Sequence, residues 1–173
     1  KENIIKSFEL LKNTFKNGNK LLVSIPQDMK FFRETTAGKV VVMGANTLKS
    51  FPNGNPLKNR VNIVLSTTIN RDDCVVVRTI DELFKEIEKY SSDEVFLIGG
   101  ARLYKTLIPY CESALVTKVD ADGGAEVFFP DLDKTEGWGL VDKGQTLESN
   151  GYNITFCTYK NSTVKEKVDV KDL

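Results

Sequence analysis

The stretch Val95-Phe-Leu-Ile-Gly-Gly-Ala-Arg-Leu-Tyr104 indicates a strand that turns directly into a helix. Its four leading apolar residues are typical of a strand buried on both faces, and Ala101–Leu107 is the expected helix. The glycine pair between them lets the backbone approach a phosphate closely, and Arg102 would add a fixed cation beside the helix N-terminus. The alternative is a tight turn that binds nothing, and two glycines alone favour that alternative.

Strands and helices alternate on both sides of this junction. Thr79-Ile-Asp-Glu82 is a capping box, which predicts a helix running to about Tyr90. Strands separated by helices pair in parallel, so the pattern predicts an open α/β sheet with ligand sites at the carboxyl ends of its strands. The other expected elements are strands at 39–43, 61–65, 74–77, 94–98, 114–119 and 151–159, and a helix at 28–34.

The first twenty residues allow two interpretations. Ile4, Ile5, Phe8, Leu11 and Phe15 share one face of a helix, whereas Asn3-Ile-Ile5 also suits the start of a strand. The pattern alone favours the helix.

The composition indicates a single globular domain over residues 1–173 and excludes several classes of function. Hydrophobic residues make up 40% of the chain and charged residues 28%, which is typical of a folded domain. The 24 basic residues balance the 24 acidic ones, so the basic excess of a nucleic-acid-binding protein is missing. No histidine is present, which excludes Ser-His-Asp and Cys-His catalysis and any histidine metal ligand.

Targeting signals and cysteines bear on localisation. No stretch reaches the ~18 apolar residues of a membrane helix, and no signal-peptide pattern opens the sequence. The three cysteines, Cys74, Cys111 and Cys157, are too far apart for a metal-binding pair and too few for a disulfide framework. We therefore expect a cytoplasmic protein with no metal, no membrane contact and no nucleic-acid partner.

Three further residues are candidates for chemistry. Asp28 lies in the first turn of an expected helix, where a carboxylate is usually a solvated cap, but Phe31 and Phe32 beside it suit an acid in an apolar cleft that binds an amino-substituted heterocycle. Arg60 is either an exposed surface arginine or a guanidinium fork for a substrate carboxylate. Thr47 follows a second strand–glycine–helix junction, and in isolation it favours helix capping over phosphate contact.

Taken together, five ordered motifs between Gly18 and Tyr159 resemble the dihydrofolate reductase family. The resemblance implies a single-domain α/β fold, with a mostly parallel central sheet flanked by helices and a C-terminal antiparallel hairpin. The motifs are Leu21-Leu-Val-Ser-Ile-Pro-Gln-Asp-Met-Lys-Phe-Phe-Arg-Glu-Thr35, Val40-Val-Val-Met-Gly-Ala-Asn-Thr-Leu-Lys-Ser-Phe-Pro52, Leu57-Lys-Asn-Arg-Val-Asn-Ile-Val-Leu-Ser66, Val95-Phe-Leu-Ile-Gly-Gly-Ala-Arg-Leu-Tyr104, and Leu115-Val-Thr-Lys-Val119 with Phe128-Phe-Pro-Asp131.

The resemblance implies NADPH-dependent reduction of 7,8-dihydrofolate to 5,6,7,8-tetrahydrofolate, in one-carbon metabolism. Asp28 would be the catalytic residue, binding the pterin 2-amino group and N3 and promoting protonation at N5 through water. Arg60 would hold the glutamate α-carboxylate, and Thr117 would support Asp28 through a hydrogen bond. The partner would be the small-molecule substrate dihydrofolate, and we expect a monomer, with a dimer as the alternative. The implied substrate site comprises Met29, Phe32, Ser50, Leu57, Arg60, Ile98 and Thr117, and the implied cofactor site comprises Ala45, Asn46, Thr47, Leu65, Ser66, Thr67, Gly99, Gly100, Ala101, Arg102, Leu103 and Tyr104.

The chain departs from the family pattern in three places. Residues 1–17 stand where the family has an apolar strand and a mobile loop but lack their character, with Lys6 inside the expected central strand. Ala45-Asn46 replaces a basic residue for the 2′-phosphate of NADPH, which predicts a reduced preference for NADPH over NADH. Leu22-Val23 replaces a Pro-Trp pair, a conservative change. Apart from these three departures, we expect residues 162–173 to be an extension beyond the family's usual end.

The sequence leaves two other functions open. The altered first segment suits a catalytically impaired homologue that binds folate or nucleotide without efficient turnover. A pyrimidine-type reductase of the same fold is a third interpretation, but Asp28, Phe32 and Arg60 argue against it because they resemble folate-site residues.

Overall fold

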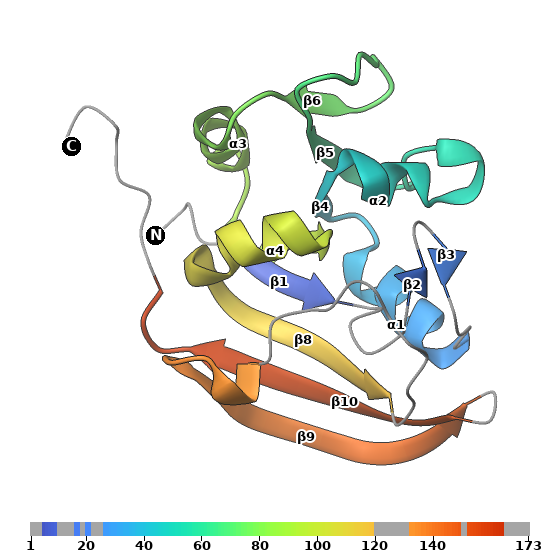
Figure 1. The fold of residues 1–173 in the computed structure, drawn as a ribbon, viewed down its shortest axis with the longest axis vertical. Coiled ribbons are helices and arrows are strands. Elements are labelled where there is room, and N and C mark those ends of the chain that lie inside the picture. The colour runs from blue at the N-terminus through green and yellow to red at the C-terminus, as the bar shows by residue number, and fades with distance from the viewer. Residues whose placement is uncertain are drawn as a thin grey trace.

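The computed structural model describes residues 5–9, 16–17, 20–21, 26–119, 132–149 and 152–164. Its largest element is an eight-stranded sheet in the order β6-β5-β4-β7-β1-β8-β10-β9 (Figure 1). The strands from β6 to β8 pair in parallel, and β10 pairs antiparallel with β8 and β9, so the predicted fold class is confirmed. The strands are β1 (Ile5–Glu9), β4 (Val40–Gly44), β5 (Val61–Leu65), β6 (Val75–Val77), β7 (Val95–Gly99), β8 (Cys111–Val119), β9 (Trp138–Ser149) and β10 (Tyr152–Asn161), with a separate pair formed by β2 (Lys16–Asn17) and β3 (Lys20–Leu21).

The strand β1 corrects the interpretation of the first segment, because the helix favoured by the apolar pattern is wrong there. Ile5–Glu9 lies in the middle of the sheet, where it pairs in parallel with β7 on one edge and with β8 on the other. Lys6 stands opposite Phe96, inside the central strand as the family resemblance implied. Hydrogen bonding along both edges outweighs the local helical pattern, because tertiary pairing routinely overrides propensity.

Among the described residues four α-helices connect the strands, and the three for which the sequence predicted a range are confirmed. The expected capping box is present: the Thr79 hydroxyl accepts the Glu82 N–H at 3.1 Å, and the Glu82 carboxylate accepts the Thr79 N–H at 3.1 Å. The helices are α1 (Pro26–Thr36), α2 (Ala45–Lys49), α3 (Ile80–Ile87) and α4 (Ala101–Leu107), and the short 3₁₀ turns are η1 (Pro52–Gly54), η2 (Ser92–Glu94), η3 (Ile108–Tyr110) and η4 (Leu132–Lys134).

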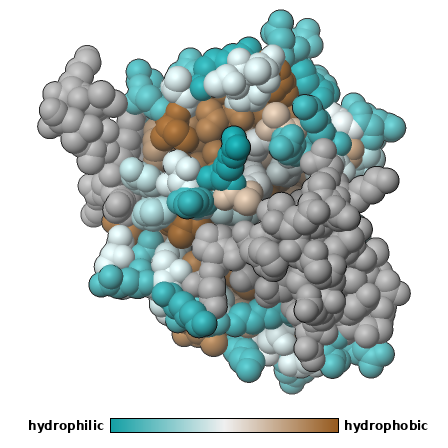
Figure 2. All heavy atoms as spheres, viewed as in Figure 1, coloured by the Kyte–Doolittle hydropathy of each residue, from teal (hydrophilic) through white to brown (hydrophobic). Residues whose placement is uncertain are grey.

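The two faces of the sheet carry separate hydrophobic clusters. Val40 and Val42 of β4 point to the face covered by α3 and α4, whereas Val41 and Met43 belong to a cluster with Leu48 of α2 on the other face. Successive residues of a strand point to opposite faces, so strands buried on both sides need the unbroken apolar runs seen in the sequence. On the face drawn in Figure 2, hydrophilic residues surround smaller areas of hydrophobic surface. None of the described helices is long and apolar enough to cross a membrane.

The C-terminal strands form a long antiparallel hairpin at one edge of the sheet. The pairing of β9 with β10 is irregular in two places, and at both of them β9 holds one extra residue. Lys118 Nζ donates to Asp133 Oδ2 at 2.7 Å, and the Tyr159 hydroxyl donates to Asp133 Oδ1 at 2.8 Å, which ties η4 to the sheet. The Phe128–Asp131 part of the last motif, Leu22-Val23, and residues 165–173 of the expected extension lie outside the described residues.

The junctions after β4 and β7 pack against each other through Thr47. The residue that precedes α2 is Gly44, and Thr47 is the third residue of that helix, so the interpretation of Thr47 as a cap is wrong. Its side chain is instead buried against the second junction: a Cβ placed on Gly99 would lie 2.6 Å from Thr47 Oγ1, and one placed on Gly100 would lie 3.4 Å from it. Gly99 is thus required for close approach, and its φ of +154° also disfavours side chains.

We expect Gly99→Ala to lower the free energy of unfolding by about 1–3 kcal/mol, the usual cost of overpacking. Urea unfolding of the parent and the variant measures this difference in the free energy of unfolding. Adding Thr47→Ala should restore part of the loss, because it removes both atoms nearest to the new methyl group. Gly139→Ala is the matched control, since no atom lies within 4 Å of a Cβ built there. Equal losses for the two alanine variants would contradict this account of the junction.

Candidate functional site

Two strand ends that lie side by side form the first part of the site. β4 and β7 are neighbours in the sheet, with Met43 opposite Gly99 near their carboxyl ends. Each strand leads into a helix through a glycine, Gly44 before α2 and Gly100 before α4. A glycine has no side chain to cap the helix, so backbone N–H groups of both first turns face outward from the same edge of the sheet. This edge is where ligands bind in open α/β sheets.

The predicted cofactor residues around these junctions divide into two kinds. Leu103 and Tyr104 have buried side chains within the hydrophobic cluster beneath α4, so they offer the junction their backbone only. Ala101 is half-buried, and Asn46 and Arg102 are exposed. Arg102 is thus exposed beside the junction, and its role as a cation for a phosphate stays a prediction.

A second loop, after β5, brings together Ser66 and a cation that sequence reasoning missed. Ser66 Oγ accepts the N–H groups of Thr68 and Ile69 at 3.2 and 3.1 Å, which folds the loop back on itself. Arg78 Nη1 donates to the Ser66 carbonyl at 2.9 Å. Arg78 can be identified from the strand pairing: Leu65 of β5 pairs with Val77 of β6, so Ser66 and Arg78, which follow these two residues, lie opposite each other.

An aromatic cluster forms the second part of the site. Phe32 of α1 and Phe96 of β7 are buried together, with Leu57, Ile98 and Leu115 packed against them. The structure thus brings together three of the predicted substrate residues, from a helix, a strand and a loop. Of the others, Thr117 is buried on β8, Met29 is 36% exposed, and the exposed Ser50 donates its hydroxyl to the Thr47 carbonyl at 2.6 Å.

Asp28 lies in the first turn of α1, one helical turn before Phe32. Residues four apart on a helix share a face, so this backbone position fits an acid beside the aromatic cluster. The expected hydrogen bond between Thr117 and the Asp28 carboxylate lies outside the described part of the structure and stays a prediction.

Arg60 is half-buried, and two hydrogen bonds hold it against the end of α1 while a third joins it to the turn before β5. Its Nε donates to Thr36 Oγ1 at 2.7 Å, its Nη1 to the Lys58 carbonyl at 2.7 Å and its Nη2 to the Arg33 carbonyl at 3.3 Å. The guanidinium carbon lies 5.8 Å from the centre of the Phe32 ring. Partial burial, with the charge of Arg33, lowers the pKa of Arg60, although a guanidinium stays charged at neutral pH.

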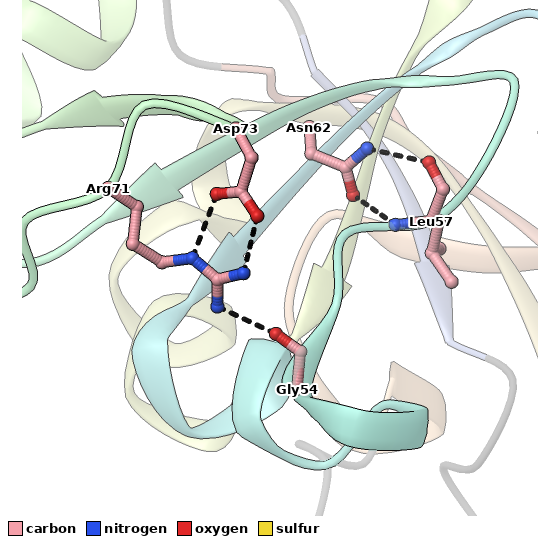
Figure 3. Close-up of polar contacts among 5 residues, drawn as sticks. All are labelled: Gly54, Leu57, Asn62, Arg71 and Asp73. Atoms are coloured by element: carbon pink, nitrogen blue, oxygen red, sulfur yellow. Dashed lines mark hydrogen bonds and ion pairs between the residues drawn. The ribbon is translucent and has the colours of Figure 1, made fainter.

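The segment from η1 to Arg60 is fastened at two points that sequence reasoning also missed (Figure 3). The Asn62 side chain bonds both the N–H and the carbonyl of Leu57, at 2.9 Å each. Arg71 donates through Nε to Asp73 at 2.8 Å and through Nη1 to the Gly54 carbonyl at 2.6 Å. The Arg71 hydrogen bond lowers the pKa of Asp73, which keeps this pair charged. Asn62 gave a signal, as a polar residue inside a buried apolar run must find partners.

Among the described residues, no three cysteine, aspartate or glutamate side chains come together in a way that would hold a metal ion.

Comparisons with known proteins agree with this geometry. The family model described as dihydrofolate reductase matches residues 11–161. The chain is 33% identical to a dihydrofolate reductase of Bacillus subtilis, over 84% of this chain and 87% of that protein. It is 35% identical to one of Schistosoma mansoni, over 82% and 87% of the two chains. A solved dihydrofolate reductase from Enterococcus faecalis, complexed with NADP(H) and RAB-propyl, superposes with a TM-score of 0.78 at 27% identity, covering 92% of this chain and 97% of that one.

The family match spans both strand–glycine–helix junctions, the aromatic cluster and Arg60, and the solved relative shares the fold over nearly its whole length. From the sheet order to the motifs, the evidence agrees: the chain belongs to the dihydrofolate reductase family, whose members are NADP-dependent oxidoreductases.

Proposed function

We propose that this chain reduces 7,8-dihydrofolate to 5,6,7,8-tetrahydrofolate with NADPH, using Asp28 as its acid and Arg60 as its carboxylate-binding residue. The observation that carries the proposal is the shared edge of the sheet, where two glycine-led helix starts lie next to the aromatic cluster of Phe32. The β1 strand also supports it, because the altered first segment was the reason to consider an impaired homologue, and that segment supplies the central strand. Loss of absorbance at 340 nm with NADPH and dihydrofolate tests the activity.

The substrate half of the site divides the work between one carboxylate and apolar surface. The Asp28 carboxylate accepts hydrogen bonds from the pterin 2-amino group and N3, and it promotes delivery of a proton to N5 through water. Phe32, Leu57 and Ile98 supply the apolar walls that exclude bulk water and fix the plane of the ring. The chain has no histidine that could act as a base. The reaction does not need one, because the substrate takes up one proton and one hydride and a single carboxylate can assist the proton transfer.

We expect Asp28→Asn to lose most of the turnover, because general acid assistance contributes about 10²–10⁴-fold. Steady-state turnover with dihydrofolate measures the loss, and circular dichroism checks the fold. Asp142→Asn, the same change at an exposed position of β9, is the matched control and should keep full turnover. An Asp28→Asn enzyme within twofold of the parent would refute the assignment.

Arg60 suits the glutamate α-carboxylate of the substrate because its contacts fix the guanidinium and leave donors over. A guanidinium carries five N–H donors, and the contacts with described residues use three of them. One donor on each Nη nitrogen is not used by the described residues, and a guanidinium with a donor on both Nη nitrogens can bind a carboxylate through both of its oxygens. Thr36 Oγ1 is itself fixed, because it donates to the Phe32 carbonyl at 2.8 Å.

We expect Arg60→Leu to weaken binding of folates by roughly 1.5–3 kcal/mol, the value of a charge-assisted hydrogen-bonded pair. A pteridine without the glutamate tail should bind almost as before. Dissociation constants for the two ligands measure the difference. Equal weakening of both would show that Arg60 has a structural role only.

The residues at the two junctions fit a dinucleotide. A Cβ added at Gly99 would lie 2.6 Å from Thr47 Oγ1, so this position of the cradle is closed to any residue but glycine, whereas one at Gly100 would lie at an ordinary contact distance of 3.4 Å. The outward backbone N–H groups of α2 and α4 suit a pyrophosphate, and Ser66 and Thr67 can donate to a phosphate on the ribose. NADPH, when bound, supplies the hydride that reaches C6 of the substrate. The chain itself binds and orients it through Ala45, Thr47, Leu65 and residues 99–104.

Arg78 supplies the cation that Ala45-Asn46 lacks. It lies next to Ser66, on the exposed side of the loop after β5, and it is held there by the hydrogen bond to the Ser66 carbonyl. A 2′-phosphate seated on this loop would therefore meet one arginine and two hydroxyl groups. The preference for NADPH over NADH then depends mainly on Arg78.

We expect Arg78→Leu to raise the dissociation constant of NADPH roughly five- to thirtyfold, which corresponds to ~1–2 kcal/mol, and to leave that of NADH almost unchanged. Ala45→Arg should strengthen NADPH binding, since it adds a second cation to the one that Arg78 supplies. NADH serves as the control in each titration. Equal weakening of both cofactors in Arg78→Leu would place the phosphate elsewhere.

A further inference from the structure

Asn62 is a buried polar side chain on the second strand from one edge of the sheet. It is 6% exposed and belongs to β5, between Val61 and Ile63. Its Oδ1 accepts the Leu57 N–H at 2.9 Å, and its Nδ2 donates to the carbonyls of Leu57 at 2.9 Å and of Arg60 at 3.1 Å. A buried amide that is satisfied by three backbone groups holds those groups in one arrangement, because breaking any bond leaves a buried polar atom without a partner.

These three bonds grip both ends of one turn. Leu57 begins the turn and Arg60 ends it, and Asn59 between them adopts a positive φ of 59°. The Lys58 carbonyl, inside the same turn, accepts a hydrogen bond from Arg60 Nη1 at 2.7 Å. The backbone that Asn62 fixes therefore also supplies one of the three acceptors that orient the guanidinium (Figure 3 shows the Leu57 contacts).

We propose that Asn62 is a positioning residue for the substrate's carboxylate: by clamping the turn from Leu57 to Arg60, it keeps the two available Arg60 donors aimed at the tail of the folate. This inference rests on the proposed function of Arg60. Asn62 contacts neither substrate nor cofactor in this scheme. It acts through the turn, so its loss should affect ligands with a tail carboxylate and spare those without one.

The experiment compares dissociation constants of dihydrofolate and of a pteridine without the glutamate tail. Asn62→Ser removes the amide and leaves the smallest polar side chain in its place. We expect it to lower the binding preference for the tail-bearing ligand about fivefold or more, a fraction of what a fixed charge-assisted pair contributes. Asn62→Asp keeps the acceptor for the Leu57 N–H but cannot donate to the two carbonyls when ionised. It is therefore a second variant in which the binding preference for the tail-bearing ligand should fall.

The chain offers a matched control in Asn161. It is also buried, at 8% exposed, and its Nδ2 donates to the carbonyls of Cys111 at 3.1 Å and of Pro109 at 3.4 Å. Its Oδ1 accepts the Thr163 N–H at 2.9 Å. Asn161 thus makes the same kind of backbone clamp on β10, far along the sheet from β5. Asn161→Ser should lower the melting temperature as Asn62→Ser does and leave the ligand preference unchanged.

A double-mutant cycle separates positioning from general loosening. Once Arg60 is replaced by leucine, Asn62→Ser should have no further effect on the ligand preference, because the group that it positions is gone. An additive effect, or an equal loss of preference in Asn161→Ser, overturns the proposal.

The other possible results for the Asn62 and Arg60 variants also support or overturn the proposal. A folded Asn62→Ser protein with the parent's preference overturns the inference alone, provided that Arg60→Leu loses that preference. If Arg60→Leu keeps it, the proposed function of Arg60 fails first, and the role of Asn62 fails with it. If neither Asn62 variant folds, the residue has a purely structural role and the proposal is likewise overturned.

Discussion

The insertion of β1 between β7 and β8 is the constraint on which the rest of the structure depends. Both edges of this strand are hydrogen-bonded, so its backbone groups have no alternative partners in the folded chain. Its width also sets the spacing of the substrate site. Phe96 on β7 and Leu115 on β8 pack in one cluster although a strand separates them, which places their backbones about 9–10 Å apart. The Phe32 ring of α1 packs in the same cluster.

The loops around the site are held by core elements rather than by themselves. The segment before β5 is fastened to a strand by Asn62, to a neighbouring loop by Arg71 and to a helix through Arg60 and Thr36. Each fastening joins a side chain to a backbone carbonyl, N–H or hydroxyl group at hydrogen-bond distance. The residues that we propose as ligand contacts therefore stand on irregular backbone that has little freedom, which is the arrangement that lowers the entropic cost of binding.

The parts that the sequence predicted well are those in which local signals agree with the tertiary structure. The Thr79–Glu82 capping box and the apolar runs of β4, β5 and β7 act within a few residues, so their elements could be placed without knowing the fold. The first segment failed for the opposite reason: β1 exists only because two distant strands bond to it. Thr47 failed similarly, since its buried contact with Gly99 joins junctions about fifty residues apart, a distance in sequence that no local pattern spans.

The site residues follow the same division. Arg60, Phe32 and the glycine pair came from contiguous motifs. Arg78 and Arg71 could be identified only from the structure, because their contacts depend on the pairing of β5 with β6 and on the folded path of the loop between these strands. Because such residues are defined by partners across the sheet, one sequence without its fold gives little reason to single them out from the other surface arginines.

The two irregularities in β9 bear on the exposed edge of the sheet. β9 is an edge strand of twelve residues, and Leu140 and Val141 on it are exposed. A flat edge of that length would offer a row of unpaired backbone groups to a second chain. Each extra residue in β9 increases the local twist and interrupts the regular spacing of those groups. The exposed charges of Asp142 and Lys143 stand at the same place, so a strand that docks in register would meet a bent and charged edge.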